Sequence, residues 1–160
     1  MHLAQLNVGR LRALLDDPLI DNFRNNLDRI NALAEVSRGF VWRLQEDSGN
    51  ATGIHVFEDE RQIINLTVWE SVDALADFTY RTGHVEFLRR RREFFEAATQ
   101  PILCLWWIAE GTLPTVADAL ARLDHLRAHG PTPIAFTFRH RFAPDGDTVE
   151  RGNERDMCPA

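Results

Sequence analysis

The sequence predicts an α+β fold in which an antiparallel β-sheet carries helices packed against it. Three observations predict this fold: short segments in which apolar and polar residues alternate, helical segments that are apolar on one side, and the order of the two along 160 residues. The hydrophobic share of 44% and the charged share of 26% are typical of one soluble globular domain. We expect that domain to span residues 1–143, and the polar segment 144–160 to be a flexible tail.

The first half of the chain predicts a strand, a helix and a second strand. Apolar and polar residues alternate from Leu3 to Leu11, as in a strand. A helix follows, because Asp17-Pro18 is a typical helix start. The helix has an apolar side made of Ile20, Phe23, Leu27, Ile30 and Ala34. Ser37-Arg38-Gly39 ends it, and residues 40–45 alternate again as a second strand.

The central stretch predicts a strand that leads directly into a helix. Residues 63–69 are apolar on both faces apart from Asn65 and Thr67, which predicts a third strand buried on both sides. Ser71 is placed to cap the following helix. We expect that helix to be interrupted at Thr82-Gly83 and then to continue, with His84 on its inward stripe.

The last part of the chain predicts two more strands around a helix. Residues 102–109 are almost continuously apolar, as in a strand buried on both faces. Thr115 caps a helix that ends at Gly130-Pro131, and residues 134–142 alternate as a fifth strand.

The predicted order consists of two β-α-β halves followed by an extra helix and strand. Two such halves form a ferredoxin-like sandwich, with the helices on one face of the sheet. The other face carries too many large apolar residues to meet water, so we expect two copies to pair through it as a homodimer.

Composition excludes several classes of function. A net charge of −6 argues against nucleic-acid binding, and no apolar run is long enough to span a membrane. The N-terminus lacks the pattern of a secretory signal, and Cys104 and Cys158 do not suggest a disulfide framework, so we expect a cytoplasmic protein. The sequence contains no metal-site spacing, phosphate loop or nucleophile elbow.

A few polar and aromatic residues are candidates for a binding or catalytic site. Asn7 and Asn65 are amides on otherwise apolar strand faces, where a ligand, a water molecule or a cross-strand bond must satisfy them. His84 could be a general base, a ligand or a core histidine. Tyr80 lies one helical turn before His84 if the helix is continuous.

Three further residues complete the candidate set. Phe87 and Arg91 share the inward stripe of the helix with His84. Arg91 could bind a carboxylate, or could instead pair with a nearby glutamate. Trp106 and Trp107 face opposite sides of their strand, and we include Trp106 as a possible pocket residue.

Three segments carry a resemblance to a known family. The segments are Trp69-Glu-Ser-Val-Asp-Ala-Leu-Ala-Asp-Phe, Gly83-His84-Val-Glu-Phe and Leu105-Trp106-Trp107. They resemble the DUF3291 group of bacterial proteins, over roughly residues 1–142. That group resembles the dimeric α/β-barrel superfamily, which includes antibiotic-biosynthesis monooxygenases and haem-degrading monooxygenases.

The resemblance implies roles for particular residues. The haem-degrading branch is similar in having an Asn on the first strand, a Trp at the end of the third strand and a His on the next helix, here Asn7, Trp69 and His84. Cofactor-free quinone-forming monooxygenases have an Asn four residues before a Trp on the third strand, which Asn65 and Trp69 match. The helix from Thr115 and the strand after it are additions to the superfamily module.

Three hypotheses follow. The first is a monooxygenase-like enzyme, needing no cofactor, that acts on a hydrophobic aromatic or polyketide-like molecule. In it Asn65 and Trp69 orient the substrate, while His84, with Tyr80, accepts a proton. The second is haem binding, with His84 as the axial ligand and Arg91 beside a propionate. The third is a dimer that binds a small ligand without catalysis.

Overall fold

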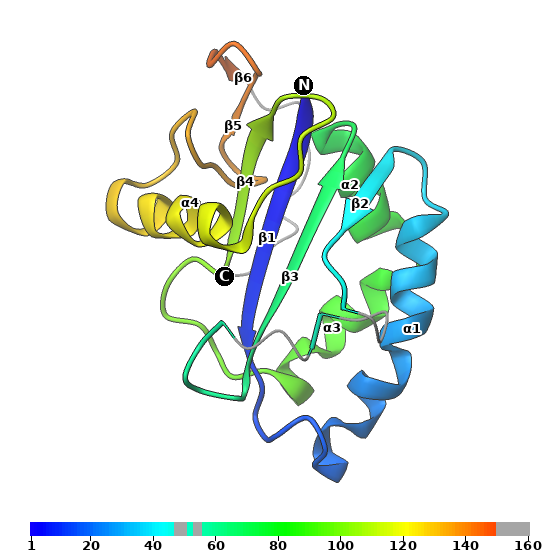
Figure 1. The fold of residues 1–160 in the computed structure, drawn as a ribbon. Helices are drawn as coiled ribbons and strands as arrows, with labels where there is room; N and C mark the ends of the chain where they lie inside the picture. The colour runs from blue at the N-terminus through cyan, green and yellow to red at the C-terminus, as the bar shows by residue number, and fades with distance from the viewer. Residues whose placement is uncertain (47–50, 53–55, 150–160) are drawn as a thin grey trace.

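The computed structural model describes residues 1–46, 51–52 and 56–149, and its centre is a four-stranded antiparallel sheet (Figure 1). The strand order is β2-β3-β1-β4, which is the order of a ferredoxin-like sheet. The predicted α+β, ferredoxin-like fold is therefore confirmed. The four strands are β1 (His2–Arg10), β2 (Phe40–Arg43), β3 (Gln62–Trp69) and β4 (Leu103–Ile108).

The 3₁₀ turn before the first helix, the second helix and the fourth helix begin at residues that the sequence marks as caps. The side chains of Asp17, Ser71 and Thr115 each accept a backbone N–H group in the first turn that follows them. These bonds satisfy donors that the helix itself leaves unpaired. A 3₁₀ turn (Pro18–Ile20) precedes α1 (Asp21–Glu35), and the other helices are α2 (Val72–Arg81), α3 (His84–Phe94) and α4 (Val116–His129).

The helices α1, α2 and α3 cover one face of the sheet, here called the helix face. Two apolar clusters fill this side. The first surrounds Trp69 and joins strand residues to Ala34 of α1 and to Leu75 and Phe78 of α2. The second lies towards the other end of the strands and contains Leu11, Ile20 and Phe94.

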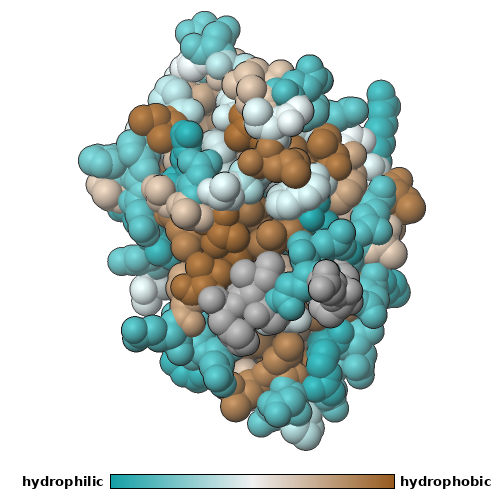
Figure 2. Space-filling model, viewed as in Figure 1, coloured by the Kyte–Doolittle hydropathy of each residue, from teal (hydrophilic) through white to brown (hydrophobic). Residues whose placement is uncertain are grey.

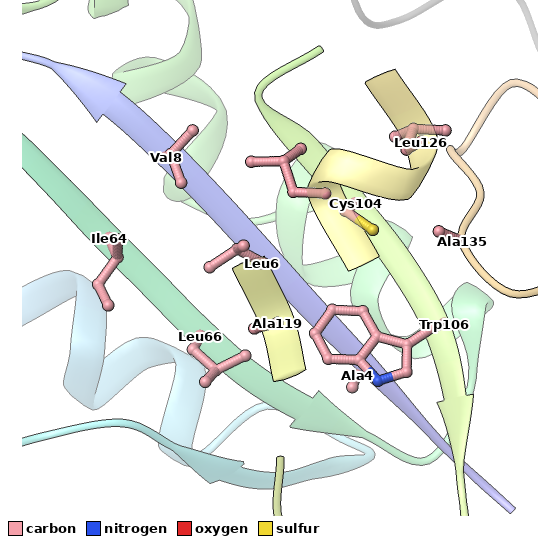
Figure 3. Packing of buried hydrophobic residues seen from close by; sticks show 11 residues of the cluster. Ala4, Leu6, Val8, Ile64, Leu66, Cys104, Trp106, Ala119, Leu126 and Ala135 are labelled. Carbon is pink, nitrogen blue, oxygen red and sulfur yellow. The ribbon is translucent and has the colours of Figure 1, made fainter. Parts of the chain in front are cut away.

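The opposite face of the sheet is partly covered by α4, which corrects the expectation that all helices share one face. Leu123 and Leu126 of α4 pack with Leu6, Cys104 and Trp106 of the sheet (Figure 3). Burial raises the pKa of the Cys104 thiol to about 12. Apolar residues still gather on this face between α4 and β2 (Figure 2). The surface left for a partner is therefore smaller than the sequence suggested.

The fifth predicted strand, residues 134–142, forms only in part. Phe136 makes an isolated bridge to Leu105, with both N···O distances 2.8 Å. The backbone N–H groups on either side bond within local turns instead, which ends the pairing: Thr132 and Ala135 bond each other, and Thr137 donates to His140. β5 (Arg141–Phe142) then pairs with β6 (Thr148–Val149).

The turn after Phe142 and strand β6 are described up to Val149, and the predicted boundary at residue 143 with a flexible segment 144–160 stays a prediction. Residues 150–160, including Cys158, lie outside the described part of the chain. In that part, none of the helices is long and apolar enough to cross a membrane.

Candidate functional site

The break between α2 and α3 holds His84 in place. Thr82 has extended backbone angles (φ −108°, ψ −176°) that end α2, and Gly83 precedes α3, so the predicted interruption is confirmed. The Thr82 hydroxyl donates to the Phe78 carbonyl oxygen at 2.6 Å and accepts the His84 backbone N–H at 3.2 Å. His84 is therefore the first residue of a new helix rather than a middle residue of a continuous one.

The hydrogen bond of the His84 ring determines its tautomer. Nδ1 lies 3.3 Å from the Thr79 carbonyl oxygen. A carbonyl only accepts, so Nδ1 must carry the proton and Nε2 keeps a free lone pair. Burial lowers the pKa of His84, an effect that the bond to Thr79 partly opposes. At neutral pH the ring is uncharged, with Nε2 able to accept a proton.

The His84 ring is the first in a row of aromatic side chains on the helix face. It packs against Phe78, with 4.9 Å between ring centroids, and Phe78 stacks on Trp69 at 5.1 Å. Trp69 in turn contacts Phe40 with the two ring planes nearly perpendicular and 5.3 Å between centroids. Trp69, predicted as a site residue, is fully buried in this row. Trp69 can therefore hold Phe78 in position, but its own side chain is not accessible to a ligand.

A buried hydrogen-bond chain continues from Trp69 into the sheet. The indole Nε1 donates to the Thr67 hydroxyl at 2.9 Å, and that hydroxyl donates to Gln5 Oε1 at 2.7 Å. Gln5 and Thr67 are only 5% and 6% exposed. Neither was among the predicted site residues, although each is a polar residue at an inward strand position, which is the signal that could have identified them.

The amides Asn7 and Asn65 lie directly opposite each other on β1 and β3, next to the Gln5–Thr67 pair on the helix face. The two apolar clusters of that face lie on either side of them along the strands. Asn65 is exposed and Asn7 is half-buried, so solvent reaches the amides between the clusters. We call the four residues Gln5, Asn7, Asn65 and Thr67 the amide stripe.

The structure places the remaining predicted residues apart from one another. The continuous helix that a Tyr80–His84 pair required is not formed, and the Tyr80 ring meets the edge of Phe138 at 5.6 Å. Phe87 lies under the guanidinium of Arg29, 5.7 Å from its centroid. Trp106 is fully buried on the opposite face of the sheet, so it belongs to the α4 core and cannot share a pocket with His84.

Arg91 lies two helical turns beyond His84, which is about 10 Å along α3. It lines a cavity of about 260 Å³ at the end of β1. A second cavity, of about 460 Å³, lies between the end of α1 and the start of α2 and includes Gly39, Ser71 and Phe78. His84 and Asn65 line neither of these two cavities.

The arrangement does not fit haem. His84, proposed as the axial ligand, lines neither of the two cavities described above, whereas Arg91, proposed to lie beside a propionate, lines the first. For a metal ion bound by side chains alone, no three His, Cys, Asp or Glu residues are grouped within the described residues. What the helix face does offer is a neutral imidazole and a row of amides on one side of a sheet.

Fold and site together define a ferredoxin-like α+β domain with polar groups between its sheet and its helices. The chain belongs to the family described as "Domain of unknown function (DUF3291)", whose model matches residues 2–152. This confirms the family resemblance seen in the sequence. None of the curated proteins matches the chain significantly.

Two solved structures are similar to part of the chain. One is SnoaB, a cofactor-independent oxygenase from Streptomyces nogalater, with 18% identity and a TM-score of 0.46. The other is a mutant of the same oxygenase, with 17% identity and a TM-score of 0.47. Each match covers 71% of this chain and 98% of the other. Similarity at this level is not informative about activity.

Proposed function

We propose that this protein is a small oxidative enzyme that deprotonates a hydroxylated aromatic or polyketide-like molecule and lets the resulting anion react with oxygen. The observation that carries the proposal is the state of His84. Its Nδ1 proton is committed to the Thr79 carbonyl, and burial favours the neutral ring. Nε2 is then unprotonated at neutral pH and can act as a general base that accepts a proton from the substrate.

The amide stripe supports the proposed substrate class. Asn7 and Asn65 offer N–H donors and carbonyl acceptors side by side on a face that is otherwise apolar. Such a face suits a flat, largely apolar molecule with a few hydroxyl or carbonyl groups. The spacing of Asn65 and Trp69, which resembles that of quinone-forming monooxygenases, supports the same reaction type. Trp69 would act indirectly, by holding the Phe78 ring against the His84 ring.

The proposed reaction balances without a further reductant. His84 Nε2 takes a proton from an activated CH₂ group, and the carbanion transfers an electron pair to O₂ as a C–O bond forms. The resulting peroxide anion receives the proton back from His84 and becomes a hydroperoxide. Loss of water then leaves a carbonyl group, so one CH₂ and one O₂ become one C=O and one H₂O.

The test uses a hydroxyanthrone, which carries such an activated CH₂ group. Oxygen uptake and quinone absorbance are followed for the wild type, for His84→Gln and for His140→Gln. Loss of a general base lowers a rate by roughly 100-fold or more, and we expect this for His84→Gln. His140 is exposed, and His140→Gln serves as the matched control that should keep full turnover.

Two outcomes would contradict the proposal. If His84→Gln folds normally and keeps full turnover, His84 is a structural residue. If the anthrone raises the melting temperature in proportion to its binding but gives no product, the protein binds such molecules without catalysis. Asn65→Ala separates the roles further, because loss of an orienting amide should raise KM more than it lowers kcat.

A further inference from the structure

We propose that the cavity at the end of β1, here called the arginine cavity, binds a small organic molecule through a carboxylate or phosphate group. It has a volume of about 260 Å³, which suits a small metabolite. Three arginines from three different elements line it: Arg10 from β1, Arg91 from α3 and Arg127 from α4. Glu96 is the one acidic residue in its lining.

Glu96 does not neutralise the other arginines of the cavity, because its carboxylate is already paired with Arg10 and Arg61. Arg10 donates to Asp59 and to Glu96, each at 2.6 Å. Arg61 contacts the same two carboxylates, at 3.4 Å from Asp59 and 3.2 Å from Glu96. These two arginines and two carboxylates balance one another. These two carboxylates therefore do not neutralise the positive charges of Arg91 and Arg127, the other arginines in the lining.

Arg91 is the first source of that charge. Among the described residues its guanidinium makes no ion pair or side-chain hydrogen bond, although the residue is partly buried. The sequence left open a pair with Glu86 or Glu93, but Glu93 pairs with Arg90 at 2.7 Å, and among the described residues Glu86 makes no ion pair with Arg91. A partly buried guanidinium without a partner gains most from an anion that supplies one.

Arg127 is the second source. Its Nε donates to the Pro101 carbonyl oxygen at 3.1 Å, which anchors the side chain beside the cavity. Its contact with Asp124 is 3.6 Å long, and the Asp124 side chain is 75% exposed, so that pair is weak. Most of the donors of Arg127 are therefore available to a ligand in the cavity that Arg91 also lines.

The remaining walls indicate what the anionic group is attached to. The Phe95 ring forms one wall, beside Gly9; a Cβ at Gly9 would lie 2.6 Å from the ring, so the close approach needs a glycine. Val8 and Ile102 add apolar surface, and Gln62 and Gln100 add amides. The ligand class is thus a short organic body with an oxyanion at one end. A guanidinium binds carboxylate and phosphate oxygens through the same paired donors.

The arginine cavity goes beyond the proposed oxidation, since it includes neither His84 nor the amide stripe. The test is therefore independent of turnover. The protein is titrated with inorganic phosphate and, separately, with succinate, at constant ionic strength with chloride as the balancing ion. Amide NMR shifts of Gly9 and Thr99, which line the cavity, report binding.

The variants are Arg91→Gln and Arg127→Gln, with Arg89→Gln as the control. Arg89 belongs to the same helix, is exposed and does not line the cavity. We expect saturable shifts in the wild type and an affinity about tenfold weaker in each cavity variant, as for loss of one charge-assisted hydrogen bond. Arg89→Gln should bind as the wild type does.

The two probes also separate the possible sources of the anionic group. A response to phosphate alone assigns the arginine cavity to phosphorylated compounds, and a response to succinate assigns it to carboxylic acids. Absence of saturable shifts with both probes would overturn the proposal. Equal weakening in Arg89→Gln would do the same, because the effect would then come from the general charge of α3.

Discussion

Thr67 donates its hydroxyl proton to the side-chain oxygen of Gln5, 2.7 Å away on the neighbouring central strand. The same hydroxyl accepts the indole N–H of Trp69 at 2.9 Å. One side chain therefore satisfies two buried groups, and it connects the amide stripe to the aromatic row that ends at His84.

We predict that Thr67→Val destabilises the protein although valine has nearly the same shape. The change leaves the Trp69 N–H and the Gln5 oxygen without their partner, which costs on the order of 1–3 kcal/mol. Thr67→Ser keeps the hydroxyl and should lose less. Urea unfolding followed by tryptophan fluorescence measures both. Equal losses in the two variants would mean that the hydroxyl contributes nothing.

The lowered pKa of His84 predicts a loss of stability in mild acid. Well above the ordinary histidine pKa of about 6.5 the ring is neutral in both the folded and the unfolded state, so it adds no pH dependence. Below that value the unfolded chain takes up a proton that the folded chain resists. The free energy of unfolding should therefore fall with pH.

His84→Gln should flatten this fall between pH 6.5 and the point where folded His84 itself titrates. The measurement is urea unfolding at a series of pH values, with His140→Gln as the control that keeps the wild-type slope. Parallel curves for the wild type and His84→Gln would show that His84 is not protected from protonation.

Gly9→Ala should destabilise the protein by about 1–3 kcal/mol, a typical cost of overpacking. The added Cβ would lie 2.6 Å from the Phe95 ring, and that ring also packs edge-on against Phe23. Gly83→Ala is the matched control, because its Cβ would meet only Leu33, at 3.7 Å. Thermal unfolding compares them. Similar melting temperatures would mean that Phe95 moves aside freely.

The homodimer remains a prediction, now for a smaller surface. Its basis is the apolar area left between α4 and β2 on the face opposite α1 and α2 (Figure 2). We expect a mass of two chains, twice 18.4 kDa, by light scattering after size exclusion. A single-chain mass at all concentrations would indicate that α4 covers enough of the sheet for the chain to remain alone.

Local patterns in the sequence predicted most of the secondary structure because they act over a few residues. Alternation placed β1 and β2, apolar residues on both faces placed β3 and β4, and the caps at Ser71 and Thr115 placed the starts of α2 and α4. The prediction of a fifth strand was wrong over most of its length, because alternation does not show whether a segment forms hydrogen bonds with a neighbouring strand. Phe136 finds Leu105, and the residues after it bond within a turn instead.

For the candidate site, the sequence by itself determined which residues are unusual: Asn7 and Asn65 as amides on otherwise apolar strand faces, and His84 after a helix break. Only the tertiary structure decided their neighbours. It separated Trp106 and Arg91 from His84, placed α4 on the second face, and joined Gln5 to Thr67. The reason is physical: periodicity records that a side is buried, whereas the element that buries it depends on the packing of distant segments.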